Sequence, residues 1–125
     1  MHNLEQERAK HALEKSKDLD RQAVNKLPAL IMNNGLLATI AFATDGDSRG
    51  GMAKAMDAIA DHLAKRQLIE RQLIGEVTAK KMLEALAGKE SVQLRLATEE
   101  ALAYLVYLKR YAQKKTKENQ KGGMR

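Results

Sequence analysis

The chain has 125 residues, of which 44% are hydrophobic and 30% charged, and it contains no cysteine. This length suits one domain with a modest core. The lack of cysteine excludes a disulfide scaffold and a thiolate-ligated metal centre, and it fits a reducing compartment. The net charge is +6, and it comes from the C-terminal end, because residues 109–125 hold seven basic residues and one acidic residue.

The N-terminal segment, MHNLEQERAK, is charged and therefore does not form a signal peptide. No apolar run approaches the roughly 18 residues of a membrane helix. We therefore expect a cytoplasmic protein with no membrane partner.

Residues 3–25 predict an amphipathic helix, because small and apolar residues recur at three- and four-residue spacing between alternating charges. The predicted stripe consists of Ala9, Ala12, Leu13, Ser16, Leu19, Ala23 and Val24.

The stretch LPALIMNNGLLATIAFA, residues 27–43, allows two interpretations. Asn-Gly between two hydrophobic runs is typical of a β-hairpin. However, neither run alternates as a half-buried strand would, whereas a helical phase continues across the Asn-Asn-Gly. We therefore predict one buried helix over 28–43, with Pro28 in its first turn and a break at Lys26 and Leu27. Gly35, with Asn33 and Asn34, is expected to allow close packing of this helix against the first and last helices.

The remaining elements are also predicted to be helical. Residues 44–51 form a loop by composition. A third helix follows, and its predicted apolar stripe consists of Met52, Ala55, Met56, Ile59, Ala60 and Leu63. The stretch 66–77 is ambiguous, since it either extends that helix or begins the next helix with an irregular connection. A short helix spans 78–87 and ends at Gly88. Ser91 is expected to cap the last helix, which runs to about Lys114. Its predicted core stripe consists of Leu94, Ala97, Ala101, Leu105, Leu108 and Ala112.

Together these elements predict an all-α fold, a single compact bundle of about five helices over residues 1–115. Residues 116–125 are expected to be a basic, flexible C-terminal tail. A concentrated basic end attracts polyanions, nucleic acid first. The other interpretation of the same charge is a solvated end that keeps the protein in solution.

The loop GDSRGG, residues 46–51, is not predicted to form a catalytic or metal-binding site. It is similar to the nucleophile loop of trypsin-like proteases, but the inserted arginine breaks the motif, so Ser48 is not predicted to be catalytic. A calcium-binding loop starting at Asp45 fails as well, because Met56 occupies the twelfth position, where a bidentate glutamate is required.

The titratable side chains do not form a catalytic or metal-binding motif either. His2, His11 and His62 lack the spacing of a helical metal site, and they are expected to be structural. Glu99 and Glu100 are adjacent and so point about 100° apart on a helix. We therefore predict a non-enzymatic protein with no catalytic residue, no cofactor and no metal.

The three tyrosines, Tyr104, Tyr107 and Tyr111, share one face of the predicted last helix and lie next to Lys109 and Arg110. Aromatic rings beside cations can stack on bases while the cations hold phosphates. Alternatively, the rings border the core and direct their hydroxyl groups outward. Both interpretations remain open from the sequence. Leu96 and Val106 fit no core stripe and are candidates for contacts with other protein chains.

Three blocks resemble the small subunit of the Cmr complex, the type III-B CRISPR RNA-guided effector. They are QERAKHALE at 6–14, LPALIMNNGLLATIAFA at 27–43, and RLATEEALAYLVYLKRYA at 95–112. The resemblance implies an all-α fold with no nuclease activity of its own. It also implies several copies of the subunit stacked beside the larger Cmr effector subunits, along the path of the guide RNA–target RNA duplex.

The resemblance implies RNA contact through basic residues, and it assigns this role to Lys10, Arg95, Lys109 and Arg110. Charge and helical face alone add Lys15, Lys17, Arg21, Lys114 and Lys115. Each is expected to contact a phosphate without reading sequence, or an acidic patch on a neighbouring subunit. The function predicted is thus an RNA-associated structural subunit for antiviral defence. The alternative is a helical protein–protein adaptor whose basic end docks an acidic partner and has no direct RNA role.

Overall fold

The computed structural model describes residues 3–45, 50–69 and 77–112 of the chain. Within these ranges it contains six α-helices, one short 3-10 turn and no β-strand. The all-α class is therefore confirmed, but the number of helices is six rather than about five. The described residues include no helix that is long and apolar enough to span a membrane. The predicted tail over 116–125 lies outside the described residues.

The N-terminal helix predicted over 3–25 is three elements rather than one, namely a helix, a 3-10 turn and the first residues of a second helix. Helix α1 (Leu4–Lys15) begins with a capping box between Asn3 and Gln6 and gives way to the 3-10 turn η1 (Ser16–Asp18). Leu19 then adopts an extended backbone and is buried. Leu13, placed in the predicted apolar stripe, is 56% exposed. The charge pattern continues through the turn, so periodicity alone did not reveal the break.

Helix α2 (Arg21–Asn34) runs through the position where a break was predicted. Lys26 and Leu27 are helical, and Pro28 lies inside the helix rather than in its first turn. The break is eight residues after Leu27, at Gly35, which separates α2 from α3 (Leu36–Ala43).

The stretch around Gly35 is therefore neither a hairpin nor one continuous helix. Gly35 has φ +90° and ψ 159°, a backbone conformation that residues with a side chain rarely adopt. The predicted close packing is wrong, because among the described residues, its two chain neighbours aside, no atom lies within 4 Å of the position that a Cβ atom of residue 35 would take. Glycine is needed here for the turn between two helices, not for the approach of a third. The two apolar runs thus share a helical phase without forming one helix.

The other helices follow the prediction more closely. Helix α4 (Gly50–Lys65) buries every member of its predicted stripe, and α5 (Ala79–Ala87) is capped by Thr78 and ends at Gly88. Helix α6 (Ser91–Tyr111) is the longest. Its N-cap is Glu90, paired with Gln93, rather than the predicted Ser91. It ends at Tyr111, short of the predicted Lys114.

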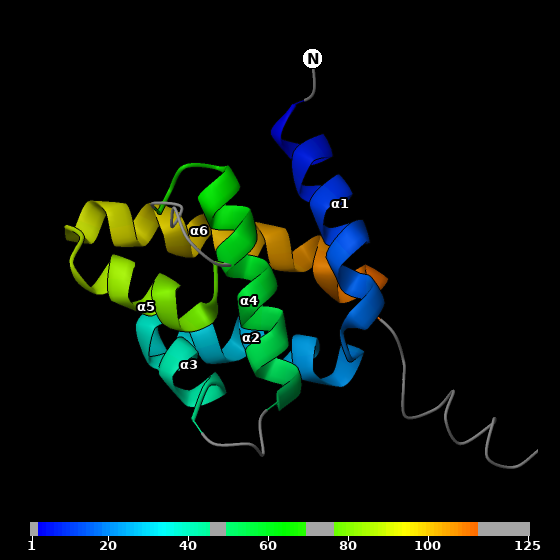
Figure 1. Cartoon of the computed structure of the whole chain (residues 1–125), viewed down its shortest axis with the longest axis horizontal. Helices are drawn as coiled ribbons and strands as arrows, with labels where there is room; N and C mark the ends of the chain where they lie inside the picture. Colours follow the sequence, from blue (N-terminus) through cyan, green and yellow to red (C-terminus); the bar gives the residue numbers. More distant parts are fainter. Residues whose placement is uncertain (1–2, 46–49, 70–76, 113–125) are drawn as a thin grey trace, which may run out of the picture.

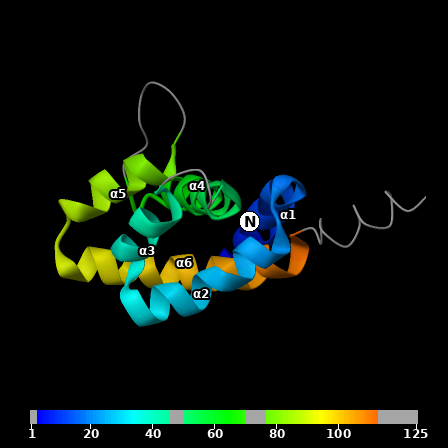
Figure 2. The ribbon, with the colours of Figure 1, turned by 90° about the horizontal axis from the view of Figure 1, so that it is seen from below.

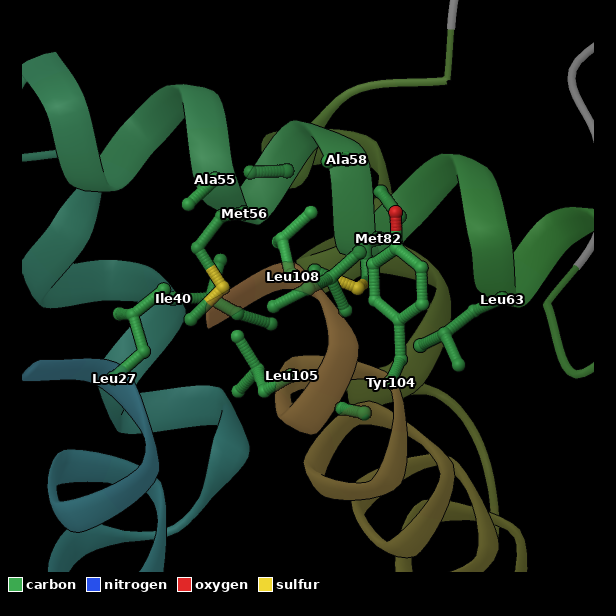
Figure 3. Packing of buried hydrophobic residues seen from close by; sticks show 14 of the residues in the cluster. Leu27, Ile40, Ala55, Met56, Ala58, Leu63, Met82, Tyr104, Leu105 and Leu108 are labelled. Atoms are coloured by element: carbon green, nitrogen blue, oxygen red, sulfur yellow. The ribbon is translucent and has the colours of Figure 1, made fainter. Parts of the chain in front are cut away.

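All six helices contribute to one hydrophobic core. Helices α2 and α6 lie side by side along one side of the molecule, and α4 crosses over them (Figures 1 and 2). Helices α3 and α5 pack beside α4, while α1 crosses the C-terminal half of α6 and extends away from the bundle (Figure 1). Large buried side chains meet between these layers, and Figure 3 shows Leu27, Ile40, Met56, Leu63, Met82, Tyr104, Leu105 and Leu108. Ile31 and Ile59 are also buried.

Candidate nucleic-acid interface

Part of the predicted basic set gathers at one corner of the molecule. Lys109 and Arg110 are exposed on the last turn of α6. The start of α2 packs against this end of α6 through Arg21, and η1, which carries the exposed Lys17, also contacts α6. We call Lys17, Arg21, Lys109 and Arg110 the basic corner. Cations at a helix C-terminus also interact favourably with the helix dipole, so this placement stabilises α6.

Arg21 has a structural role that the sequence did not reveal. Its Nε donates to the carbonyl oxygen of Ala112 at 3.1 Å, and its Nη2 donates to the carbonyl oxygen of Arg110 at 2.8 Å. The last carbonyl groups of a helix have no partner within the helix. Arg21 supplies such a hydrogen-bond partner and so connects the start of α2 to the end of α6. Its positive charge remains at the corner, but its hydrogen-bonding groups are partly occupied.

A surface hollow lies between α2 and α6 at the same place. It is lined by Arg21, Asn25, Val106, Lys109 and Arg110. Val106 is 56% exposed, so the hollow offers an apolar floor beside three cations. Such a mixture suits a phosphate with its attached sugar or base, and it equally suits an acidic and aliphatic protein segment.

The remaining predicted residues are dispersed. Arg95 is exposed on α6, fifteen residues before Arg110, which corresponds to about 22 Å along the helix axis. Lys10 and Lys15 are exposed on α1, and the Nζ of Lys15 lies 3.9 Å from a carboxylate oxygen of Asp61. Lys114 and Lys115 lie outside the described residues. The structure thus brings four of the nine predicted residues together.

The tyrosines do not form a stacking platform. Tyr104 is fully buried and its hydroxyl group lies 2.6 Å from Nδ1 of His11, so its predicted outward direction is wrong. Tyr107 donates its hydroxyl hydrogen to Glu5 at 2.9 Å, which raises its pKa. Tyr107 and Tyr111 are half-buried against the core. The interpretation that places the rings at the core therefore holds for all three.

Sequence reasoning missed a buried polar cluster at the crossing of α1, α4 and α6. Glu100 accepts two hydrogen bonds from Arg8, at 2.7 and 2.8 Å, and lies 2.7 Å from Nε2 of His62. Nε2 of His11 lies 2.6 Å from Asp61. The rings of His62 and Tyr104 are stacked, with centroids 4.2 Å apart. The helical phase of Glu100 could have indicated that it is buried. Glu100 follows Ala97 by three residues and precedes Tyr104 by four, which places it on the core stripe.

The cluster shifts the ionisation of its members. Burial lowers the pKa of His11 and of His62, although Asp61 and Glu100 oppose the shift. Burial alone would raise the pKa of Asp61 and Glu100. Hydrogen bonds from His11 to Asp61, and from Arg8 and His62 to Glu100, outweigh it only together with the nearby positive charges, and the pKa of both carboxyl groups is lowered. Burial raises the pKa of Tyr104. The arrangement therefore favours neutral histidines beside charged carboxylates.

The cluster is not arranged as a metal centre. Within residues 3–45, 50–69 and 77–112, no group of three or more His, Asp or Glu side chains could hold a metal ion. Each carboxylate is instead engaged by a histidine and by at least one lysine or arginine. Its evident role is to fix α1 on the bundle.

Comparison with known proteins gives one match. The family model described as CRISPR-associated protein (Cas_Cmr5) matches residues 4–115 of the chain. No curated protein and no solved structure matches the chain significantly.

Proposed function

The chain belongs to the Cas_Cmr5 family, the small subunit of the type III-B CRISPR complex, and from this premise we propose that it is a non-catalytic scaffold subunit. In this proposal the basic corner contacts the path of the guide RNA–target RNA duplex, and other Cmr subunits cover the apolar surface of α6. The proposal places the subunit in the cytoplasm, where the effector meets its target RNA.

The observation that carries the RNA part is the convergence of Lys17, Arg21, Lys109 and Arg110 from two distant parts of the sequence. Three of these side chains are exposed and the fourth keeps its charge at the surface. Phosphate contacts from such a surface would be independent of RNA sequence and would weaken with salt.

The assembly part rests on exposed apolar side chains along α6. Val92, Leu96 and Val106 are between 48% and 56% exposed, and Met32 on the neighbouring α2 is 74% exposed. Exposed apolar groups on adjacent helices are typical of surfaces that become covered in an assembly. In the proposal they face a larger backbone subunit or another copy of this chain.

Charge reversal at the basic corner tests the RNA part. The variant Lys109→Glu/Arg110→Glu is compared with Lys80→Glu, which changes an exposed lysine on α5, a helix that lies away from the C-terminal end of α6 (Figure 1). Binding of RNA to the assembled effector is measured at several salt concentrations. We expect weaker binding and a salt dependence reduced by about one unit for each lost phosphate contact. The Lys80 variant should match the unmodified protein.

The same experiment separates the adaptor alternative. If the basic corner docks an acidic protein, the double variant would fail to enter the complex, and weak RNA binding by the isolated subunit would not change. An unaltered affinity and salt dependence in a fully assembled complex would contradict the RNA contact.

A further inference from the structure

Helix α1 is held on the bundle mainly by polar side chains. Of its residues only His11 and Ala12 are buried, and it contributes no large aliphatic side chain to the buried core. Its polar residues instead contact α4 and α6, through the pairs Glu5–Tyr107, Glu7–Arg66, Arg8–Glu100, His11–Asp61 and His11–Tyr104. A helix of this length is marginal in isolation. The helicity of α1 therefore depends on these contacts.

His11 is the centre of this docking, and its hydrogen bonds fix its tautomer. A charged carboxylate can only accept, so Nε2 of His11 must carry the hydrogen that points to Asp61. Nδ1 then has no hydrogen and must accept from the hydroxyl group of Tyr104, 2.6 Å away. The neutral imidazole thus uses both nitrogens, one toward α4 and one toward α6.

A second proton on the imidazole of His11 would disturb the hydrogen bond that His11 makes with Tyr104. It would add to Nδ1, turning that atom into a donor that faces the hydroxyl hydrogen of Tyr104. The hydroxyl would have to turn, yet among the described residues it has no second hydrogen-bond partner, and Tyr104 is fully buried. A buried donor without an acceptor is costly.

The surrounding charges act in both directions, because Asp61 favours a charged His11 whereas His62 and Lys65 oppose it. His11 faces Asp61, His62 and Lys65 of α4 and Tyr104 of α6. Asp61 already lies 3.5 Å from Nζ of Lys65 and 3.9 Å from Nζ of Lys15. The ring of His62 lies 5.3 Å from that of His11, while Glu100 beside it is engaged by Arg8. The new positive charge would therefore enter a site whose carboxylates are already paired.

We propose that α1 is a releasable helix, and that protonation of His11 detaches it from α4 and α6 while the other five helices stay folded. The remaining helices keep their core, because its large aliphatic side chains come from α2 to α6. Detachment would uncover Tyr104, His62 and Glu100, and it would separate Lys10 and Lys15 from the rest of the basic surface. This device does not depend on the RNA contact proposed above.

Hydrogen exchange on the full chain tests the proposal. Protection of the amides in 4–15 and in 101–108 is measured near pH 7.5 and near pH 5.5, either side of the ordinary histidine pKa of about 6.5, and corrected for intrinsic exchange. We expect protection of α1 to fall by roughly tenfold at the lower pH, while α6 stays much better protected than α1 at both pH values. Equal protection of the two segments at the lower pH, or no change in the protection of α1, would overturn the proposal.

A matched variant assigns the effect to His11. His11→Asn does not titrate, and its side-chain oxygen can still accept from Tyr104. We expect α1 of this variant to lose most of its pH dependence, and a pH dependence as large as that of the unmodified protein would overturn the role of His11. If the variant does not fold, nuclear magnetic resonance of the unmodified protein replaces it. His11 should then carry its hydrogen on Nε2, and the α1 amide signals should shift with its titration. An Nδ1 tautomer, or α1 signals that follow another midpoint, would contradict the proposal.

Discussion

His62 and Glu100 lie 2.7 Å apart at the crossing of α4 and α6, and the same carboxylate accepts two hydrogen bonds from Arg8 of α1. Three helices are thus joined through one buried side chain. Glu100→Gln removes the negative charge and leaves Arg8 without a charged partner. We expect a loss of roughly 2–4 kcal/mol in the free energy of unfolding, measured by urea denaturation. Glu99→Gln, at the exposed neighbouring position, should change stability by less than about 0.5 kcal/mol. Equal effects at the two positions would show that the cluster contributes little.

Gly35 should tolerate substitution poorly because of its backbone, not its surroundings. Gly35→Ala forces a side chain into a φ of +90°, and we expect a cost of about 1–3 kcal/mol in thermal or urea unfolding. Gly88→Ala is the matched control, since Gly88 has φ −94° and a Cβ atom there would lie an ordinary 3.9 Å from the nearest backbone oxygen. That change should be neutral or slightly stabilising. A neutral Gly35→Ala would mean that α2 and α3 can join in another way.

Global stability should rise with pH. Folding lowers the pKa of His11 and His62, so the unfolded chain binds more protons below the ordinary histidine pKa of about 6.5. The contribution of these groups is fully present above that pH and is lost as the pH falls through it. Asp61 and Glu100, whose pKa values are also lowered, add a second loss near pH 4 and below. Urea midpoints measured across this range check the prediction, and a maximum of stability below pH 6 would contradict it.

Arg21 should act through geometry as well as charge. Arg21→Lys keeps the positive charge but cannot reproduce two hydrogen bonds from one planar group to the carbonyl oxygens of Arg110 and Ala112. We expect a loss of about 1–2 kcal/mol in stability and faster amide exchange in the last turn of α6. Lys17→Arg, an exchange at an exposed position of the same corner, is the control and should change neither property. Full rescue of stability by lysine at position 21 would argue for charge alone.

The sequence predicted the features that depend on periodicity. The buried stripe of α4 and the end of α5 at Gly88 were predicted correctly, because apolar spacing and a glycine at the end of a helix are local signals. The breaks at Ser16 and Gly35 were not predicted, because the stripes on either side stay in phase. Pro28 was wrongly interpreted as the start of a helix. A helix can also contain proline in its interior when the structure around it holds the chain in place.

The candidate site was harder to predict because it depends on long-range contacts. Nothing local to Arg21 indicates that it bonds the backbone of residues ninety positions later, and His11 meets Tyr104 only after the chain has folded. The sequence indicated which residues of the basic corner are charged, but it did not indicate that they lie close together in the fold. Conversely, Arg95 and Lys109 share one helix and were grouped by charge, yet they lie at different positions along it.

Two of the three tyrosines form hydrogen bonds with residues of α1, so the protein carries an intrinsic optical signal for the docking of this helix. The chain contains no tryptophan, so tyrosine dominates its near-ultraviolet absorption and its fluorescence. Tyr104 is hydrogen-bonded to His11 and Tyr107 to Glu5, so both phenol groups lose a partner whenever α1 leaves the bundle. Tyrosine emission of the unlabelled protein should therefore report whether α1 is docked on the bundle, without any dye or engineered residue.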